Sequence, residues 1–166
     1  MGYDISRYTI YIRVLSTRFI INKMEALIGN TFKTENGTIS LEQLQASCDV
    51  IAVYFSAHWC PPCRGFTPVL VKFYNEVNAS GKKLEIVFGS IDQSEDQFNE
   101  YFKEMPWVAI PFGDPKIRGT MNDLGIQGIP NLKVFKKDGS VTDIDGRSDV
   151  QGTGPSVISD WISKTA

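Results

Sequence analysis

The sequence is poor in cysteine and in long hydrophobic runs, and neither sign of charge dominates it. Three cysteines among 166 residues are far too few for a secreted scaffold built on disulfides, so we expect a reducing compartment. Charged residues interrupt every apolar stretch before it reaches the roughly eighteen residues of a membrane span. With seventeen Lys and Arg against nineteen Asp and Glu, no long-range field favours nucleic acid or anionic lipid. We therefore expect a soluble protein without nucleic-acid or membrane partners.

Length and composition favour one compact domain with an N-terminal extension. A chain that is 42% hydrophobic and 22% charged can bury its own core. Residues 1–23 carry four basic residues against one acidic residue, which is typical of a mitochondrial leader. The alternation of Ile10, Ile12 and Val14 instead favours a strand, and a methionine that follows could be the natural start. We expect residues 1–23 to be a leader, a dispensable extension or an added strand, and 24–166 to form the domain.

Strand and helix patterns alternate along the first half of that domain. Val50 to Phe55 and Leu84 to Ile91 are apolar runs typical of buried strands. Helical spacing of apolar residues follows each run, from Pro61 to Gly81 and then after a Ser94 cap. This alternation predicts parallel βαβ units.

The remaining patterns predict hairpins and short helices around those units. They are a hairpin over 32–39 with a turn at 35–37 that contains Asn36-Gly37, a helix from a Ser40-Gln43 capping box, a helix start at Asp114-Pro115, a hairpin over 132–144 with a turn at 137–139, and a last helix over 155–164. Gly152-Thr153-Gly154 is expected to be a loop. Together the patterns predict an α/β fold, a mixed central sheet with helices on both faces.

The motif Trp59-Cys60-Pro61-Pro62-Cys63 places two thiols at the start of a predicted helix. Unpaired backbone N–H groups and the helix dipole stabilise an anion there, so the pKa of Cys60 should fall below the ordinary value of about 8.5. Cys60 is then the nucleophile. Cys63, one turn on, can attack the mixed disulfide and release the reduced substrate, which makes it the resolving thiol.

The two prolines and the tryptophan shape this predicted site. Pro61 and Pro62 suit the first helical positions, but they remove two N–H donors from the Cys60 sulfur. A moderate fall in the pKa of Cys60 favours a reductant over a strong oxidant. Trp59 supplies a flat apolar wall beside the sulfur and a surface for docking.

A zinc site is the alternative interpretation of two cysteines at this spacing. Two further ligands would be needed. His58 and Cys48 are the only other soft candidates, and neither is well spaced for the same ion. We therefore expect no metal and no cofactor beyond a redox-active Cys60-Cys63 disulfide.

Gly128-Ile129-Pro130 precedes a predicted strand and forms a second candidate element. A cis proline there would expose backbone groups that could pair with an extended substrate. An ordinary trans bond is the commoner case, and the residues alone leave both alternatives open.

The stretch Phe55 to Arg64, which contains the dithiol, resembles the nucleoredoxins and tryparedoxins of the thioredoxin superfamily. Glu104 to Phe112 and Gly125 to Pro130 are similar to further signatures of that group, and the resemblance spans roughly residues 24–166. It implies a thioredoxin fold and a cis Ile129-Pro130 bond facing Cys60. It also implies that Trp59 and Trp107 lie near the active surface.

The sequence departs from that family at Asn131 and from ordinary thioredoxins at Tyr54, which the tryparedoxin-like branch shares. Asn131 stands where a threonine is common, and Tyr54 stands where ordinary thioredoxins have a buried, proton-relaying aspartate. The resemblance therefore leaves the proton for the Cys63 step to water or another acid, with Asp92 and Glu104 as weak candidates. Animal nucleoredoxins are also longer, multidomain chains.

Several other residues are expected to have ordinary structural roles. We expect His58 to be a solvent-facing loop residue and Cys48 to be a small buried apolar residue. Arg64 and Arg147 could attract an anionic dithiol, although solvated surface arginines are commoner. Trp161 should pack the last helix into the core.

These observations together predict an enzyme that reduces protein disulfides, including those of a peroxidase. A reductase or a low-molecular-weight dithiol would recharge it. The alternative is a binding module whose reduced and oxidised forms bind a partner differently. We expect a monomer in the cytoplasm, with the nucleus or mitochondrion as alternatives.

Overall fold

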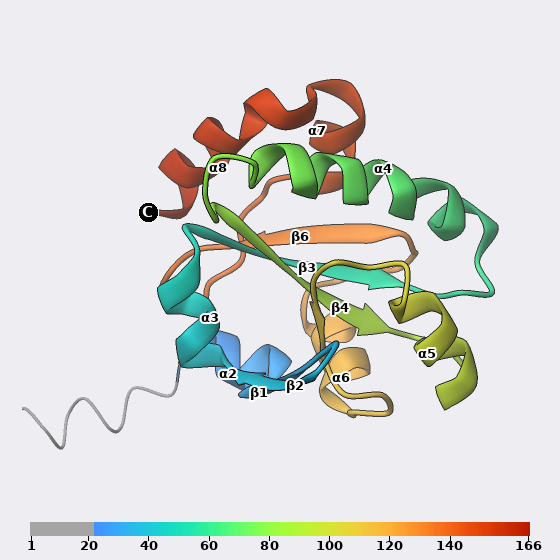
Figure 1. The fold of residues 1–166 in the computed structure, drawn as a ribbon. Coiled ribbons are helices and arrows are strands. Elements are labelled where there is room, and N and C mark those ends of the chain that lie inside the picture. The colour runs from blue at the N-terminus through green and yellow to red at the C-terminus, as the bar shows by residue number, and fades with distance from the viewer. Residues whose placement is uncertain (1–21) are drawn as a thin grey trace, which may run out of the picture.

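A computed structural model describes residues 22–166 and contains a six-stranded mixed sheet (Figure 1). The strand order is β2-β1-β5-β4-β3-β6. β3 runs parallel to β4 and antiparallel to β6, while β5 joins β4 in parallel. The strands are β1 Thr31–Thr34, β2 Gly37–Ser40, β3 Val50–Ser56, β4 Leu84–Ser90, β5 Val108–Ala109 and β6 Asn131–Phe135. The expectations for residues 1–21 lie outside the described part of the chain.

Helices cover both faces of this sheet, as the sequence predicts. One layer contains α2 Lys23–Ile28, α3 Leu41–Ser47 and α6 Lys116–Asp123. The other contains α4 Pro61–Val77, α5 Glu95–Phe102, α7 Gly146–Gly152, the 3₁₀ helix η1 Gly154–Val157 and α8 Ile158–Thr165. In Figure 1, α4, α7 and α8 lie above the sheet, and α2 and α6 lie below it. The mixed sheet with two helical layers confirms the α/β fold class.

Strand β3 is the element that carries the chain to the dithiol. All seven of its residues are buried, because side chains of a strand alternate between the two faces and both faces are covered. Val50, Ala52 and Tyr54 join the core beneath α4, whereas Ile51 and Val53 join the core beneath the other layer. The strand therefore holds the start of α4 between two packed cores.

Helix α4 ends earlier than its sequence pattern predicts. It stops at Val77 rather than near Gly81. The side chain of Asn78 accepts hydrogen bonds from the backbone N–H groups of Lys83 and Leu84 at 2.9 and 3.0 Å and donates to the Leu84 carbonyl at 3.0 Å. Asn78 thus connects the end of α4 to the beginning of β4, and the chain has no room for another helical turn.

The N-terminal hairpin is confirmed, but its turn differs from the prediction. β1 pairs antiparallel with β2, and Thr34 faces Gly37 across the pair. The loop therefore contains only Glu35 and Asn36, and Gly37, which the prediction placed in the turn, begins β2. Asn36 does not have a positive φ, so the turn is not the one that Asn-Gly usually forms.

Helix caps follow the sequence closely in this half of the chain. The Ser40 hydroxyl accepts from the Gln43 N–H, and the Gln43 side chain accepts from the Ser40 N–H, which completes the capping box of α3. At α5 the Ser94 hydroxyl accepts from the Gln97 N–H at 3.3 Å. The Gln97 side chain accepts from the N–H of Gln93 instead of that of Ser94. The reciprocal bond that would complete a capping box at α5 is therefore not formed.

The hairpin predicted over 132–144 forms its first strand, β6, and its turn, but the second predicted strand is wrong. Val141 makes a single bridge to Phe135, and no strand follows. Asp145 caps α7 by accepting from the Ser148 N–H at 3.2 Å, which takes the chain out of the sheet. At Gly146 an added Cβ would lie 2.9 Å from the Leu132 carbonyl oxygen, so the start of α7 rests directly on β6. The sequence patterns did not predict α7, nor the short elements α2 and β5.

Candidate active site

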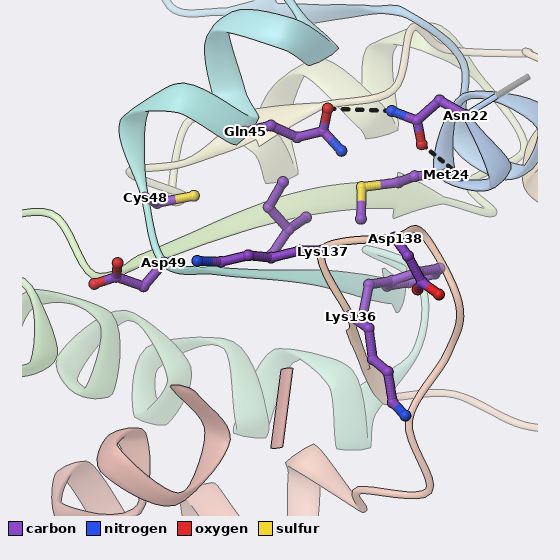
Figure 2. A pocket seen from close by; sticks show the side chains of 10 residues that line it. Asn22, Met24, Gln45, Cys48, Asp49, Lys136, Lys137 and Asp138 are labelled. Atoms are coloured by element: carbon purple, nitrogen blue, oxygen red, sulfur yellow. Dashed lines mark hydrogen bonds between the residues drawn. The ribbon is translucent and has the colours of Figure 1, made fainter. Parts of the chain in front are cut away.

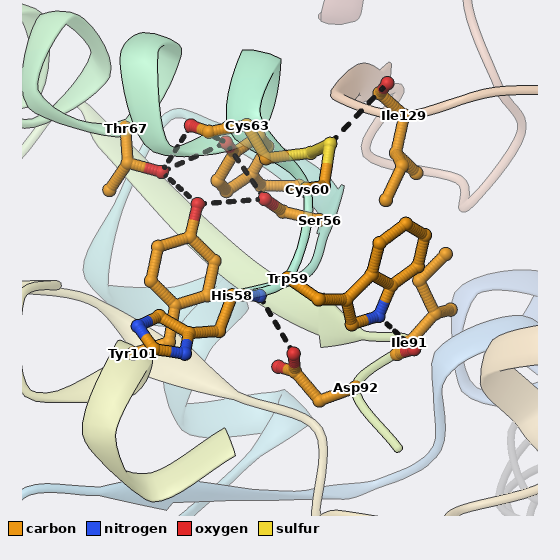
Figure 3. Close-up of a disulfide and its surroundings, with 11 residues drawn as sticks. Ser56, His58, Trp59, Cys60, Cys63, Thr67, Ile91, Asp92, Tyr101 and Ile129 are labelled. Carbon is orange, nitrogen blue, oxygen red and sulfur yellow. Dashed lines mark hydrogen bonds between the residues drawn. A yellow bond between two sulfur atoms is a disulfide. The ribbon is translucent and has the colours of Figure 1, made fainter. Parts of the chain in front are cut away.

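The two cysteines of the predicted dithiol meet at the N-terminus of α4. Cys60 is the N-cap residue, and Cys63 lies in the first turn. They form a disulfide with their Cα atoms 5.2 Å apart (Figure 3). Cys60 is 5% exposed and Cys63 is fully buried. A reagent approaching from solvent therefore reaches the Cys60 sulfur first.

The start of α4 provides an electropositive environment for Cys60 without any side-chain cap. Pro61 and Pro62 occupy the first two helical positions, as predicted, and Cys60 receives no capping hydrogen bond. The first backbone bond of the helix runs from the Arg64 N–H to the Cys60 carbonyl at 3.1 Å. The positive end of the helix dipole is thus directed at the sulfur, which favours a thiolate once the disulfide is reduced.

The loop before β6 lies against the same sulfur. The Ile129-Pro130 peptide bond is cis, which confirms what the family resemblance implies. The Ile129 carbonyl oxygen is 4.0 Å from Cys60 Sγ, and Pro130 is buried. Ile129 also packs on the small apolar cluster around Cys60 and Cys63. The predicted substrate loop and the dithiol are therefore adjacent.

Trp59 and Trp107 have opposite environments. Trp59 is 48% exposed beside the disulfide, and its indole N–H donates to the Ile91 carbonyl at 3.3 Å. Trp107 is buried, and its ring packs edge-on against Tyr54 and Tyr74. The alternation into β5 directs Trp107 into the core beneath α4, so a role for Trp107 near the active surface stays a prediction.

The two weak proton-donor candidates also differ in position. Asp92 is buried, and its carboxylate accepts from the His58 N–H and the Ser90 hydroxyl, both at 2.7 Å. Glu104 is exposed. His58 is not the solvent-facing residue that we expected: it is half-buried, with its ring 5.6 Å from that of Tyr101. Asp92 therefore fixes the backbone two residues before Cys60.

A group of four buried hydroxyls lies directly beneath Cys63, and the sequence patterns gave no sign of it. Tyr54 and Ser56 come from β3, Thr67 from α4 and Tyr101 from α5. Figure 3 labels Ser56, Thr67 and Tyr101. Tyr54 and Thr67 both direct their hydroxyls at the Cys63 carbonyl, at 3.4 and 3.1 Å. Burial, and then the neighbouring Tyr101, raises the pKa of Tyr54 above its ordinary value. The tyrosine therefore stays protonated.

Cys48 lies at the opposite end of β3 and takes no part in this site. The seven residues of that strand separate it from Cys60 by about 23 Å at about 3.3 Å per residue. It is half-buried, and its thiol donates to the Leu44 carbonyl at 3.3 Å. Burial, and then the charge of Glu85, raises the pKa of Cys48 to about 11. The thiol lines a cavity of about 490 Å³ (Figure 2).

The remaining predicted residues have mostly structural environments. Trp161 is fully buried, and its indole donates to Asp149 at 2.8 Å. The guanidinium of Arg147 lies 5.9 Å from the centre of the Phe66 ring. Arg64 is exposed immediately after Cys63. Of the two arginines, Arg64 is therefore the one that is exposed and next to the dithiol in the chain.

Neither a metal cluster nor a membrane-spanning helix is found in the described part of the chain. Among residues 22–166, no three His, Cys, Asp or Glu side chains are grouped to hold an ion. No helix within that range is long and apolar enough to cross a bilayer.

Comparisons with known proteins agree with this geometry. A thioredoxin-like family model matches residues 48–141, more than half of the chain. Nucleoredoxin from Bos taurus is 45% identical over 127 residues, which cover 76% of this chain and 29% of that protein. The structure of a thioredoxin from Wuchereria bancrofti superposes with a TM-score of 0.68 and 42% identity, covering 83% of this chain and 97% of the other.

A solved tryparedoxin completes the comparison. The structure of tryparedoxin II complexed with glutathionylspermidine superposes with a TM-score of 0.71 and 31% identity, covering 83% of this chain and 94% of the other. The chain spans only about three tenths of the length of the nucleoredoxins that it matches. The sheet, the bonded cysteine pair and these matches together show that the chain belongs to the thioredoxin-like family.

Proposed function

We propose that this protein is a thiol–disulfide oxidoreductase that reduces disulfides in other proteins. The observation that carries the proposal is the Cys60–Cys63 pair at the start of α4, with the Ile129 carbonyl 4.0 Å from Cys60 Sγ. A dipole that favours a thiolate, a second thiol within bonding reach and an adjacent backbone acceptor are what disulfide exchange requires.

Exchange proceeds in two steps in which electrons and protons balance. The Cys60 thiolate attacks one sulfur of the substrate disulfide, forms a mixed disulfide and releases one substrate thiolate. Cys63 loses its proton to solvent and attacks Cys60 Sγ, which releases the second substrate thiolate and forms the Cys60–Cys63 disulfide. The dithiol has then given two electrons to the substrate, and the two released thiolates take up protons from water.

The surroundings of the dithiol suit an extended polypeptide substrate. Trp59 offers an exposed aromatic face, and the loop around Ile129 offers backbone groups beside Cys60. A substrate strand that pairs with this loop would bring its disulfide to the sulfur. Pro61 and Pro62, exposed at the helix start, border the same approach. We propose that protein disulfides, including that of a peroxidase, bind here.

The electron donor is proposed to be a reductase or a low-molecular-weight dithiol. The related tryparedoxin II was solved with glutathionylspermidine, a small thiol conjugate. Arg64, exposed next to Cys63, could attract a carboxylate of an anionic low-molecular-weight dithiol. The cycle needs no cofactor besides the Cys60–Cys63 disulfide. We propose that the protein works as a monomer in the cytoplasm or the nucleus, where thiols are kept reduced.

Reduction of insulin disulfides, with dithiothreitol as the electron donor, tests the proposal. The wild-type chain should accelerate the reaction, and Cys60→Ser and Cys63→Ser should each abolish the acceleration. Cys48→Ser is the matched control and should keep full activity, because Cys48 lies at the far end of β3. Turnover that survives in Cys60→Ser would contradict the proposal. No turnover in the wild-type chain, with a partner that binds the two redox states differently, would favour a binding module instead.

A further inference from the structure

The four hydroxyls beneath Cys63 form a closed ring of hydrogen-bonding neighbours. Ser56 donates to Tyr54 at 3.0 Å, and Tyr54 lies 3.0 Å from Thr67. The Thr67 hydroxyl forms a hydrogen bond with the Tyr101 hydroxyl. The Tyr101 hydroxyl lies 3.0 Å from that of Ser56, which closes the ring. None of the four side chains is more than 1% exposed. The ring joins β3, α4 and α5 at the point where α4 begins (Figure 3).

The four hydroxyls have fewer protons than the hydrogen bonds that their positions allow. The four edges of the ring and its two bonds to the Cys63 carbonyl are six donor–acceptor pairs, but four hydroxyls supply only four protons. The Cys63 carbonyl can therefore accept from Tyr54 and Thr67 together, from one of them or from neither. These arrangements differ only in the rotation of O–H bonds.

The bonds from Tyr54 and Thr67 to the Cys63 carbonyl act at the start of α4. Cys60 provides no side-chain cap, and Pro61 and Pro62 have no N–H groups to bond to the preceding loop. The hydroxyls of Tyr54 and Thr67 therefore supply polar side-chain bonds to the first turn of the helix. Both hydroxyls thus bond to the backbone of Cys63, and the Cys63 sulfur is the one that must reach Cys60.

We propose that Tyr54 and Thr67 are positioning residues for the resolving thiol, and that they hold Cys63 in place by hydrogen-bonding to its carbonyl. This rests on the proposed disulfide-exchange function and assigns these residues to its second step. Cys63 must attack in line with the mixed disulfide on Cys60, and a fixed backbone keeps its sulfur in that geometry. The first step uses only Cys60, so it does not depend on the ring.

A disulfide reagent whose two halves are released separately distinguishes the two steps. Reduced protein attacks 5,5′-dithiobis(2-nitrobenzoate) through Cys60 and releases one coloured thiolate, and the attack of Cys63 on Cys60 releases the second. Stopped-flow absorbance, in a Cys48→Ser background, gives both rates. Thr67→Val and Tyr54→Phe should each slow the second release about fivefold, the cost of one buried hydrogen bond, and leave the first release within about twofold.

Matched controls separate positioning from a loss of stability. Thr67→Ser keeps the hydroxyl and should restore the wild-type rate of the second release. Tyr74→Phe removes another buried hydroxyl, one bonded to Glu85, and should slow neither step even if it lowers the melting temperature. Two substitutions on different elements keep the test valid if one variant fails to fold.

The outcomes also separate this proposal from the function on which it rests. A wild-type chain that never releases the second thiolate would contradict the dithiol cycle itself. A wild-type chain that releases both, with an unchanged ratio of rates in Thr67→Val and Tyr54→Phe, would overturn only the positioning role. An equal slowing in Thr67→Ser or Tyr74→Phe would overturn it as well, because packing would then explain the effect.

Discussion

The backbone N–H of His58 donates to the carboxylate of Asp92 at 2.7 Å, which ties the end of β4 to the loop that carries the dithiol. The second carboxylate oxygen accepts from the Ser90 hydroxyl, so both oxygens are occupied. Asp92 is thus engaged in holding the loop two residues before Cys60. This gives a buried acid a structural reason to be there, separate from proton transfer.

Asp92→Ala should therefore lower the stability of the protein more than Asp92→Asn. Alanine leaves the half-buried His58 N–H without its acceptor, which costs about 1–3 kcal/mol, whereas asparagine keeps an oxygen in place and should cost less than about 1 kcal/mol. Urea unfolding measures both. Asp92→Asn should also keep insulin-reducing activity; its complete loss would indicate that the carboxyl supplies a proton after all.

The reactivity of the three cysteines should follow exposure and thiolate fraction. In the reduced protein, iodoacetamide should label Cys60 first, because Cys60 is more exposed than Cys63 and lies at the helix start. Peptide mapping by mass spectrometry gives the order. Preferential labelling of Cys63 would reverse the two roles.

Cys48 should be the slowest of the three and the most dependent on pH. With a pKa raised from 9.0 to about 11, it carries about a hundredfold less thiolate at pH 8 than an ordinary thiol of that starting value. Its labelling rate should still increase about tenfold per pH unit between pH 8 and 10. A rate that levels off near pH 9 would mean that the burial of Cys48 does not suppress its ionisation.

The redox potential should be that of a reductant. Pro61 and Pro62 withhold two donors from the Cys60 thiolate, so the reduced form is only moderately stabilised. We expect a potential of about −270 to −200 mV, the range of thioredoxin and the glutaredoxins, rather than about −120 mV as in DsbA. Equilibration with glutathione buffers measures it, and a value above about −150 mV would be inconsistent with this reasoning.

Pro61→Gly should make the same couple more oxidising. The substitution restores one N–H near the sulfur, which should lower the pKa of Cys60 and stabilise the reduced form. Absorbance of the thiolate during a pH titration gives the pKa, and glutathione buffers give the potential. A shift of both quantities in the opposite direction would show that the proline acts through backbone rigidity.

Replacement of two glycines by alanine should change the stability of the fold in opposite directions. Gly139 has φ +84°, and an added Cβ would collide with the backbone nitrogen of Met24, so Gly139→Ala should destabilise the fold by about 1–3 kcal/mol. Gly65 lies inside α4 with open space around it, so Gly65→Ala should stabilise the fold by about 0.5–1 kcal/mol. Thermal unfolding compares them, and a stabilising Gly139→Ala would show that the turn does not rest on α2.

The elements that sequence alone predicts are those with a strong local pattern. The apolar runs of β3 and β4 and the caps at Ser40 and Ser94 need no knowledge of the rest of the chain. β5 has only two residues, Val108 and Ala109, which is too short for a periodic signal. Helix α7 begins and ends with glycine, a residue that disfavours helices, and forms because its start packs on β6.

The candidate site also has a part that the sequence predicts and a part that it does not. The dithiol and its prolines are contiguous in sequence, so their chemistry follows from a single motif. The hydroxyl ring joins β3 to Thr67 and Tyr101, which lie 34 residues apart along the chain, and only Tyr54 among its members stands out in the sequence. The burial of Trp107 likewise depends on β5, whose pairing with β4 only the folded chain reveals.

The most direct test of the dithiol cycle is to identify the cysteine that carries the mixed disulfide. Cys63→Ser and Cys60→Ser, each in the reduced form and in a Cys48→Ser background, are mixed with a peptide disulfide, and the adducts are mapped by mass spectrometry. We predict one peptide per chain on Cys60 in the Cys63→Ser variant, formed rapidly and cleaved by dithiothreitol, and almost none on Cys63 in the Cys60→Ser variant. Adducts that form on Cys63 as fast as on Cys60 would contradict the assignment of nucleophile and resolving thiol.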